Sequence, residues 1–169
     1  MALRNIRLLC RGFLQKMVNE GNLALAPAFI AADSVHHELG EEMPPEYRSG
    51  PGAMADFVKL YRRAFPDLHV KIEDEVIEGN RVVTRFRFQG TQTGPLMGIA
   101  ASGQQVSVEG IRIDKVENGK IAESWMQWDL LLLLEQIGAL PKLCRQPARA
   151  SAPFEGTVRQ GSPEAALAA

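Results

Sequence analysis

Apolar residues in the first third of the chain recur with the spacing of amphipathic helices. Residues 3–20 carry one apolar stripe and residues 52–65 carry another, a pattern that places apolar side chains on one face of a helix. The first stripe consists of Ile6, Leu9, Cys10, Phe13, Leu14 and Met17. A shorter helical stretch, residues 27–32, lies between the two and continues as an extended segment through His37. The sequence therefore predicts three helices ahead of the sheet.

From Leu68 onward the apolar period changes to two. Residues 68–77 and 81–90 alternate as half-buried strands do. Residues 104–129 predict two further strands joined by a tight turn at "ENGK", and the leucine-rich residues 130–140 predict a short closing helix. Helices gathered ahead of an antiparallel sheet are typical of an α+β fold. A curved sheet wrapped over helices would leave a conical cavity at one end, which is a natural ligand site.

Composition indicates one folded domain with a tail. The chain has 169 residues, of which 46% are hydrophobic and 23% are charged, and its net charge is −1. These values are ordinary for a globular protein. After Pro141 the sequence becomes rich in Ala, Pro, Gly and Ser without periodicity, so we predict a domain over residues 1–141 and a flexible tail over residues 142–169. The basic residues are scattered, so neither nucleic acid nor a membrane is expected as a partner.

The cysteines and the hydrophobic segments indicate the cellular setting. Cys10 and Cys144 lie far apart and form no CxxC pair, so neither a disulfide framework nor a zinc site is predicted. The N-terminal segment lacks a small-residue cleavage site and is interpreted as a helix rather than a signal peptide. The run of five leucines is far too short to span a bilayer. The sequence thus predicts a cytoplasmic protein without a bound metal.

Asp129 is the most conspicuous ionisable residue, because it lies between an aromatic strand and five consecutive leucines. Strand alternation places Glu123, Trp125, Gln127 and Asp129 on one face, and Ser124, Met126 and Trp128 on the other. If the first face lines the cavity, Trp125 rather than Trp128 shapes the pocket, and burial would raise the pKa of Asp129 toward a range useful for proton transfer. Alternatively, Asp129 is the N-cap of the leucine-rich helix, for which Asp is a favoured residue. The two roles do not exclude each other.

Other polar residues could also contribute to a site. His36 and His37 face opposite sides of an extended segment, so at most one faces the cavity, where a neutral imidazole could orient a carbonyl or pass a proton; the alternative is a surface or hydrogen-bonded core histidine. Glu109 shares a strand face with two isoleucines and is either buried or, if the strand bulges at Gly110, exposed. No glycine-rich nucleotide motif, nucleophile elbow or metal-binding motif accompanies them. A nucleotide cofactor is therefore not indicated, and the chemistry available is acid/base work in an apolar pocket.

Several stretches spread over residues 50–140 together match one known pattern. They are "AFPDLH", "EGNRVVTRF", "GTQTGPLMGI", "GIRIDKVENGKIAESW", the Asp129 that follows, and "LLEQIGAL"; the earlier "DSVHHE" supplies an acid and a histidine, with His37 the better match. In these stretches the chain resembles the SnoaL-like polyketide cyclase (ester cyclase) family. The resemblance implies a conical nuclear transport factor 2-like fold, a homodimer or higher homo-oligomer, and cofactor-free chemistry. It also implies that the aspartate at position 129 acts as general acid/base in an intramolecular aldol closure.

The chain departs from the family pattern at two polar positions. Gln92 stands inside the "GTQTG" motif, at a position where family members commonly carry histidine. Ser124 stands directly before Trp125, at a position where family members also often carry histidine. Gln92 can hydrogen-bond a substrate oxygen but cannot shuttle a proton at neutral pH. The candidate catalytic residues are Asp129 and His37, and the candidate substrate-binding residues are Trp125, Gln92, Tyr47, Glu109 and Met97.

The leading hypothesis is a cofactor-independent cyclase that acts on a polyketide-like or other hydrophobic carbonyl compound, with Asp129 as the acid/base. One alternative is an epoxide-opening cyclase or hydrolase, in which Glu109 or Glu123 would work beside Asp129. The other is a non-catalytic small-ligand-binding dimer, which the missing family histidines favour. In that case Asp129→Asn would cost stability rather than chemistry.

Overall fold

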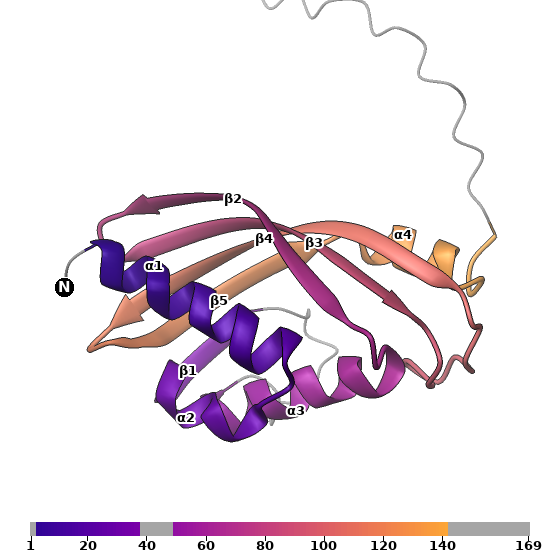
Figure 1. Ribbon diagram of the computed structural model, residues 1–169, viewed down its shortest axis with the longest axis horizontal. Coiled ribbons are helices and arrows are strands. Elements are labelled where there is room, and N and C mark those ends of the chain that lie inside the picture. The colour runs from indigo at the N-terminus through magenta and orange to yellow at the C-terminus, as the bar shows by residue number, and fades with distance from the viewer. Residues whose placement is uncertain (1–2, 38–48, 142–169) are drawn as a thin grey trace, which may run out of the picture.

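The computed structural model describes residues 3–37 and 49–141 of the chain (Figure 1). In chain order its elements are α1 (Leu3–Gly12), the π-helix η1 (Phe13–Asn19), the 3-10 turn η2 (Leu23–Leu25), α2 (Ala26–Phe29), β1 (Ile30–His37), α3 (Gly50–Ala64), β2 (His69–Glu78), β3 (Arg81–Thr91), β4 (Gln105–Glu117), β5 (Lys120–Trp128) and α4 (Leu130–Gln136). The candidate residue Tyr47 and the predicted tail, 142–169, lie outside the described residues. In the part of the chain that is described, no helix is both long and apolar enough to cross a membrane.

The two predicted amphipathic helices form and bury their apolar stripes. The first runs through α1 and η1, where the last turns widen so that the amide of Glu20 donates to the carbonyl of Gln15, five residues earlier. The second, α3, ends at Phe65, whose backbone is no longer helical, because the proline that follows disfavours the helical region. Both helices direct their buried side chains toward the sheet.

The five strands form one sheet in the order β1-β5-β4-β3-β2. Strands β2 to β5 are an antiparallel meander, and the "ENGK" turn between β4 and β5 places Asn118 and Gly119 at φ angles of 50° and 78°, as a type I′ hairpin turn requires. The prediction of about four antiparallel strands needs one correction, because the extended segment before His37 is a fifth strand that pairs parallel with β5. Its partner lies almost ninety positions further along the chain, so local alternation could not reveal the pairing.

The sheet bends around the N-terminal helices. Figure 1 shows α1 and α3 on the same side of the curved sheet, with α4 near the end of β5. The α+β prediction of helices packed inside a curved sheet is confirmed. The core between helices and sheet includes Phe13, Met17, Met54, Phe65 and Val108.

Candidate functional site

An apolar cavity lies between the helices and the concave face of the sheet. The helices contribute Phe13, Leu14, Met54 and Val58 to its wall, and the strands contribute Phe86 and Met126 among others. The space open to the centres of water-sized molecules is about 60 Å³. This exceeds what one water needs, roughly 10–15 Å³ on the same measure, but it is smaller than a typical ligand pocket of roughly 300–1,000 Å³. A ligand larger than a few atoms must therefore displace side chains of the wall.

One side of the cavity is an aromatic wall. Phe57 and Tyr61 on α3 meet Phe88 on β3 and Trp128 on β5. The Tyr61 and Trp128 rings lie edge to face with centroids 5.1 Å apart, and Phe88 meets Trp128 in the same way at 5.4 Å. Such rings give a large apolar contact area with a preferred geometry, which suits a flat or conjugated ligand.

The face of β5 that lines the cavity is the opposite of the predicted one. Met126 and Trp128 are in the cavity wall, whereas Trp125 lies on the outer face of the sheet. The predicted division of β5 into two faces is correct, since Trp125 lies on one face and Met126 and Trp128 lie on the other. Alternation fixes which residues lie together, but it does not say which set meets the helices.

Asp129 caps helix α4. Its Oδ1 accepts a hydrogen bond from the backbone amide of Leu132 at 2.9 Å, so the predicted N-cap role is confirmed. The carboxylate is exposed and borders a shallow depression on the outer face of the sheet, together with Arg85 and Glu109. It is not part of the cavity wall, and its predicted acid/base role stays a prediction.

The two histidines occupy opposite faces of β1, as predicted. His36 is buried, and its Nδ1 and Nε2 lie 3.0 Å and 3.2 Å from the hydroxyls of Ser124 and Ser34. His37 lies on the outer face, where its ring stacks on Trp125 at 5.1 Å and its Nε2 lies 3.1 Å from Glu123 Oε1. The candidate His37 is therefore brought together with Trp125, but neither lines the cavity.

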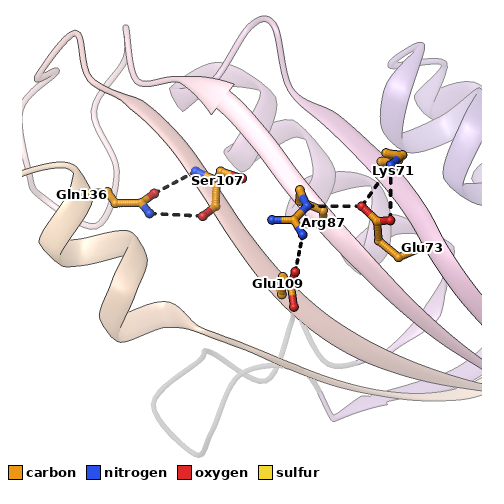
Figure 2. Close-up of polar contacts among 6 residues, drawn as sticks. All are labelled: Lys71, Glu73, Arg87, Ser107, Glu109 and Gln136. Carbon is orange, nitrogen blue, oxygen red and sulfur yellow. Dashed lines mark hydrogen bonds and ion pairs between the residues drawn. The ribbon is translucent and has the colours of Figure 1, made fainter. Parts of the chain in front are cut away.

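Glu109 belongs to an ionic row on the outer face of the sheet. Figure 2 shows Arg87 between Glu73 and Glu109, with Lys71 on the far side of Glu73. Glu109 is exposed, and an exposed pair of this kind typically contributes only up to about 1 kcal/mol. The burial that its isoleucine neighbours suggested is absent because those isoleucines also point outward.

Gln92 and Met97 lie in the loop between β3 and β4. The Gln92 side chain is fully buried, donates to the carbonyl of Ala100 and accepts from the hydroxyl of Ser102 at 2.6 Å. These hydrogen bonds join the two ends of the loop and stabilise its conformation. Met97 is exposed at a positive φ of 49° in the turn between Leu96 and Ile99, so neither candidate is a cavity-lining residue.

Arg112 and Asp114 are the charged residues that the sequence analysis missed. They point inward from β4, are 3% and 1% exposed, and are joined by a bond of 2.8 Å from Arg112 Nε to Asp114 Oδ1. The guanidinium also lies over the ring of Phe13 at 4.7 Å and borders the cavity. The pairing across the "ENGK" hairpin could have indicated them, because it aligns these two with Met126 and Ser124 on the more apolar face of β5.

Helix α4 closes the sheet beyond the end of β5. The side-chain amide of Gln136 replaces a neighbouring strand: its Oε1 accepts from the amide of Ser107 at 2.8 Å, and its Nε2 donates to the Ser107 carbonyl at 3.1 Å (Figure 2). Leu133 and Ile137, on either side of Gln136 in the sequence, are buried. Among the described residues, no group of three or more His, Cys, Asp or Glu side chains is placed to hold a metal ion.

The comparison with known families settles the relationship of the chain. The model of the SnoaL-like polyketide cyclase family matches residues 8–137. The chain belongs to this family. A search of curated proteins gives no match.

Solved structures support the same fold. TsrD from Streptomyces laurentii is 31% identical, superimposes with a TM-score of 0.73, and aligns over 83% of this chain and 99% of its own. IdmH from Streptomyces antibioticus, a proposed polyketide cyclase, is 26% identical with a TM-score of 0.68 over 79% of this chain and 98% of its own. AclR from Streptomyces galilaeus, a proposed hydroxylase, is 24% identical with a TM-score of 0.72 over 85% and 87%. The conical fold of this SnoaL-like chain is therefore shared with proteins to which different activities are attributed.

Proposed function

We propose that the protein is a cyclase that binds a polyketide-like or other hydrophobic carbonyl compound in the apolar cavity and closes a ring by an intramolecular aldol-type reaction. The observation that carries the proposal is the cavity itself, walled by Phe57, Tyr61, Phe88 and Trp128 and bordered by one guanidinium, Arg112. Membership of a polyketide cyclase family supports the reaction class. The cytoplasmic location expected from the sequence remains a prediction.

The reaction needs a proton removed from a methylene beside a carbonyl, attack of the resulting enolate carbon on a second carbonyl, and return of a proton to the new alkoxide. It forms one carbon–carbon bond and requires no oxidant or reductant. Arg112 remains protonated in proteins, so it suits the stabilisation of an enolate or alkoxide oxygen rather than proton uptake. The water-poor cavity would strengthen that interaction.

A second candidate function is ligand binding without chemistry. It is favoured by a specific observation: within residues 3–37 and 49–141, no carboxylate and no histidine lines the cavity. Asp129 and His37, the two residues expected to move protons, both lie on the other face of the sheet. The epoxide-opening alternative would need an acid and a base together, and the acids Glu109 and Asp129 meet at the outer depression rather than in the cavity.

The test is turnover of polyketide-type esters that carry a methylene between two carbonyls. Mass spectrometry and carbon NMR of the product would show a new carbon–carbon bond. Val58→Trp, which fills the cavity, is expected to abolish both binding and turnover, whereas Leu8→Trp, at an exposed position of α1, serves as the matched control and should leave both intact. Tight binding without any product would favour the binding function, and equal turnover by the two variants would contradict a reaction in the cavity.

The outer face of the sheet supports the expected homodimer. Cross-strand register aligns an apolar row across the sheet, His37, Trp125, Ile113, Val83 and Val76. A charged row that includes Lys115 and Arg81 flanks it on one side; on the other side lie Ile111 and Arg85, followed by the row of Arg87 and Glu109. An apolar centre with a polar rim is the usual anatomy of a protein interface, and we propose that a second copy packs on this row.

A further inference from the structure

Three buried polar residues lie side by side on the inner face of the sheet. Glu75 on β2 is paired with Thr84 on β3, Thr84 with Arg112 on β4, and Arg112 with Met126 on β5. Directly opposed side chains on one face of a sheet are close enough to interact. Arg112 and Met126 line the cavity. Thr84 and Glu75 continue the row from Arg112 toward α1, whose Arg11 contacts Glu75.

Two oxygens in the row have no hydrogen-bond partner. They are Oε1 of Glu75 and Oγ1 of Thr84, both buried. The Glu75 side chain is only 3% exposed, and its other oxygen accepts from Arg11 Nε at 2.6 Å. Thr84 is completely buried. Buried polar atoms are normally paired, and leaving one unpaired costs about 1–3 kcal/mol, so two on adjacent strands indicate a place that a polar group of a ligand would fill.

The chemistry of the row defines that group. A carboxylate oxygen can only accept a hydrogen bond, a threonine hydroxyl can donate or accept, and a guanidinium can only donate. A hydroxyl or enol matches all three, because it donates to Glu75 and accepts from the others. A ligand carboxylate would meet the like charge of Glu75, and an aliphatic group would leave both oxygens unpaired.

We propose that Glu75, Thr84 and Arg112 form a polar subsite that binds the hydroxyl or enol group of an otherwise apolar ligand, whose remaining atoms lie against the aromatic wall. The inference rests on the proposed use of the cavity for ligand binding and names the class of ligand. It makes Thr84 a specificity-determining residue. The subsite and the wall of Tyr61 and Trp128 would hold a flat hydroxylated compound by its two ends.

The test compares 2-naphthol with 2-methylnaphthalene, which have nearly the same shape but differ in the hydroxyl. Both are titrated by fluorescence against the full chain and three variants. The wild type should bind 2-naphthol more tightly, by threefold to tenfold, about the contribution of one hydrogen bond. Thr84→Val replaces the hydroxyl with a methyl group of similar size. This variant should bind 2-naphthol more weakly and so lose the preference for 2-naphthol over 2-methylnaphthalene. Thr84→Ser should keep it, and Thr93→Val, at an exposed threonine, should leave it unchanged.

The outcomes separate the subsite from the cavity. Equal affinity for the two probes in the wild type, or an unchanged preference in Thr84→Val, would overturn the subsite and leave the cavity-binding proposal standing. Failure of both probes to bind would overturn the subsite together with the proposed use of the cavity. Chemical denaturation of the ligand-free proteins shows whether Thr84→Val is folded. It should be at least as stable as the wild type, because the buried hydroxyl that it removes has no partner.

Discussion

Arg112 donates from Nε to Asp114 Oδ1 at 2.8 Å, beside a cavity whose other lining residues, among those described, are aliphatic or aromatic. Both residues come from the inner face of β4, two positions apart, and both are almost fully buried. Each charge is compensated by its neighbour at a place that is almost closed to bulk solvent. The pair therefore both anchors the fold and fixes the guanidinium beside the cavity.

Removing one partner of this pair should be costly. Asp114→Asn leaves the Arg112 charge buried without its carboxylate, and the expected loss in the free energy of unfolding is about 3–5 kcal/mol. Urea denaturation followed by circular dichroism measures it. Glu109→Gln, which breaks the exposed pair with Arg87, is the control and should cost no more than about 1 kcal/mol. A similar small cost for both variants would show that the buried pair is not required for stability.

Asp129 can be tested with two substitutions that separate capping from chemistry. Asp129→Ala removes the bond to the Leu132 amide and should lower stability by about 0.5–2 kcal/mol. The sequence-based expectation that Asp129→Asn costs stability needs correction, because Asn is as good an N-cap residue as Asp. Asp129→Asn should therefore retain stability and, because the carboxylate lies outside the cavity, it should also retain ligand binding and turnover. Complete loss of turnover in a stable Asp129→Asn protein would instead support the acid/base role that the sequence suggested.

Cys10 should behave as a protected thiol. Burial is the largest cause that raises its pKa far above the ordinary value, and Asp114 adds to it. In a Cys144→Ser background, the native protein should react with a disulfide reagent at pH 8 far more slowly than the urea-unfolded chain, because the thiolate is the reactive form. A native reaction as fast as that of the unfolded chain would contradict the burial.

The same thiol predicts how stability changes in alkali. Its pKa is raised in the folded state, so the folded protein holds the proton above the pH at which the unfolded chain releases it. The contribution is fully present below the unfolded pKa of about 8.5 and is lost as pH rises beyond it, by at most about 1.4 kcal/mol per pH unit. The difference in unfolding free energy between wild type and Cys10→Ala should therefore shrink between pH 8 and pH 10. A constant difference would contradict this linkage.

The proposed dimer predicts the effect of charge on the outer apolar row. Ile113→Glu introduces a carboxylate into its middle and should shift the protein to monomer, as measured by light scattering after size-exclusion chromatography. Leu8→Glu, at an exposed position of α1, is the matched control and should leave the assembly unchanged. A wild-type protein that is already monomeric at micromolar concentration would overturn the proposed interface.

Strand β4 shows why the inner and outer faces were confused. Its apolar isoleucines, Ile111 and Ile113, point outward, whereas Arg112 and Asp114 point inward. A rule that puts apolar residues inside therefore assigns the wrong face to this strand, and it would bury Glu109 together with the isoleucines. Charged residues can lie on the inner face because Arg112 and Asp114 compensate each other. Isoleucines can lie on the outer face because they lie in or beside the apolar row on which we propose that a second copy packs.

The sequence by itself determined the main helices, the meander and the tight turn at "ENGK", and it offered the cap as one of two roles for Asp129, because these depend on residues a few positions apart. Its motifs also determined the family, which the match over residues 8–137 confirmed. Only the tertiary structure decided that β1 pairs with β5, that Trp128 rather than Trp125 faces the cavity, and that Glu75, Thr84 and Arg112 meet. These relationships depend on how distant strands align and which face the helices cover, and strand periodicity is the same for either face.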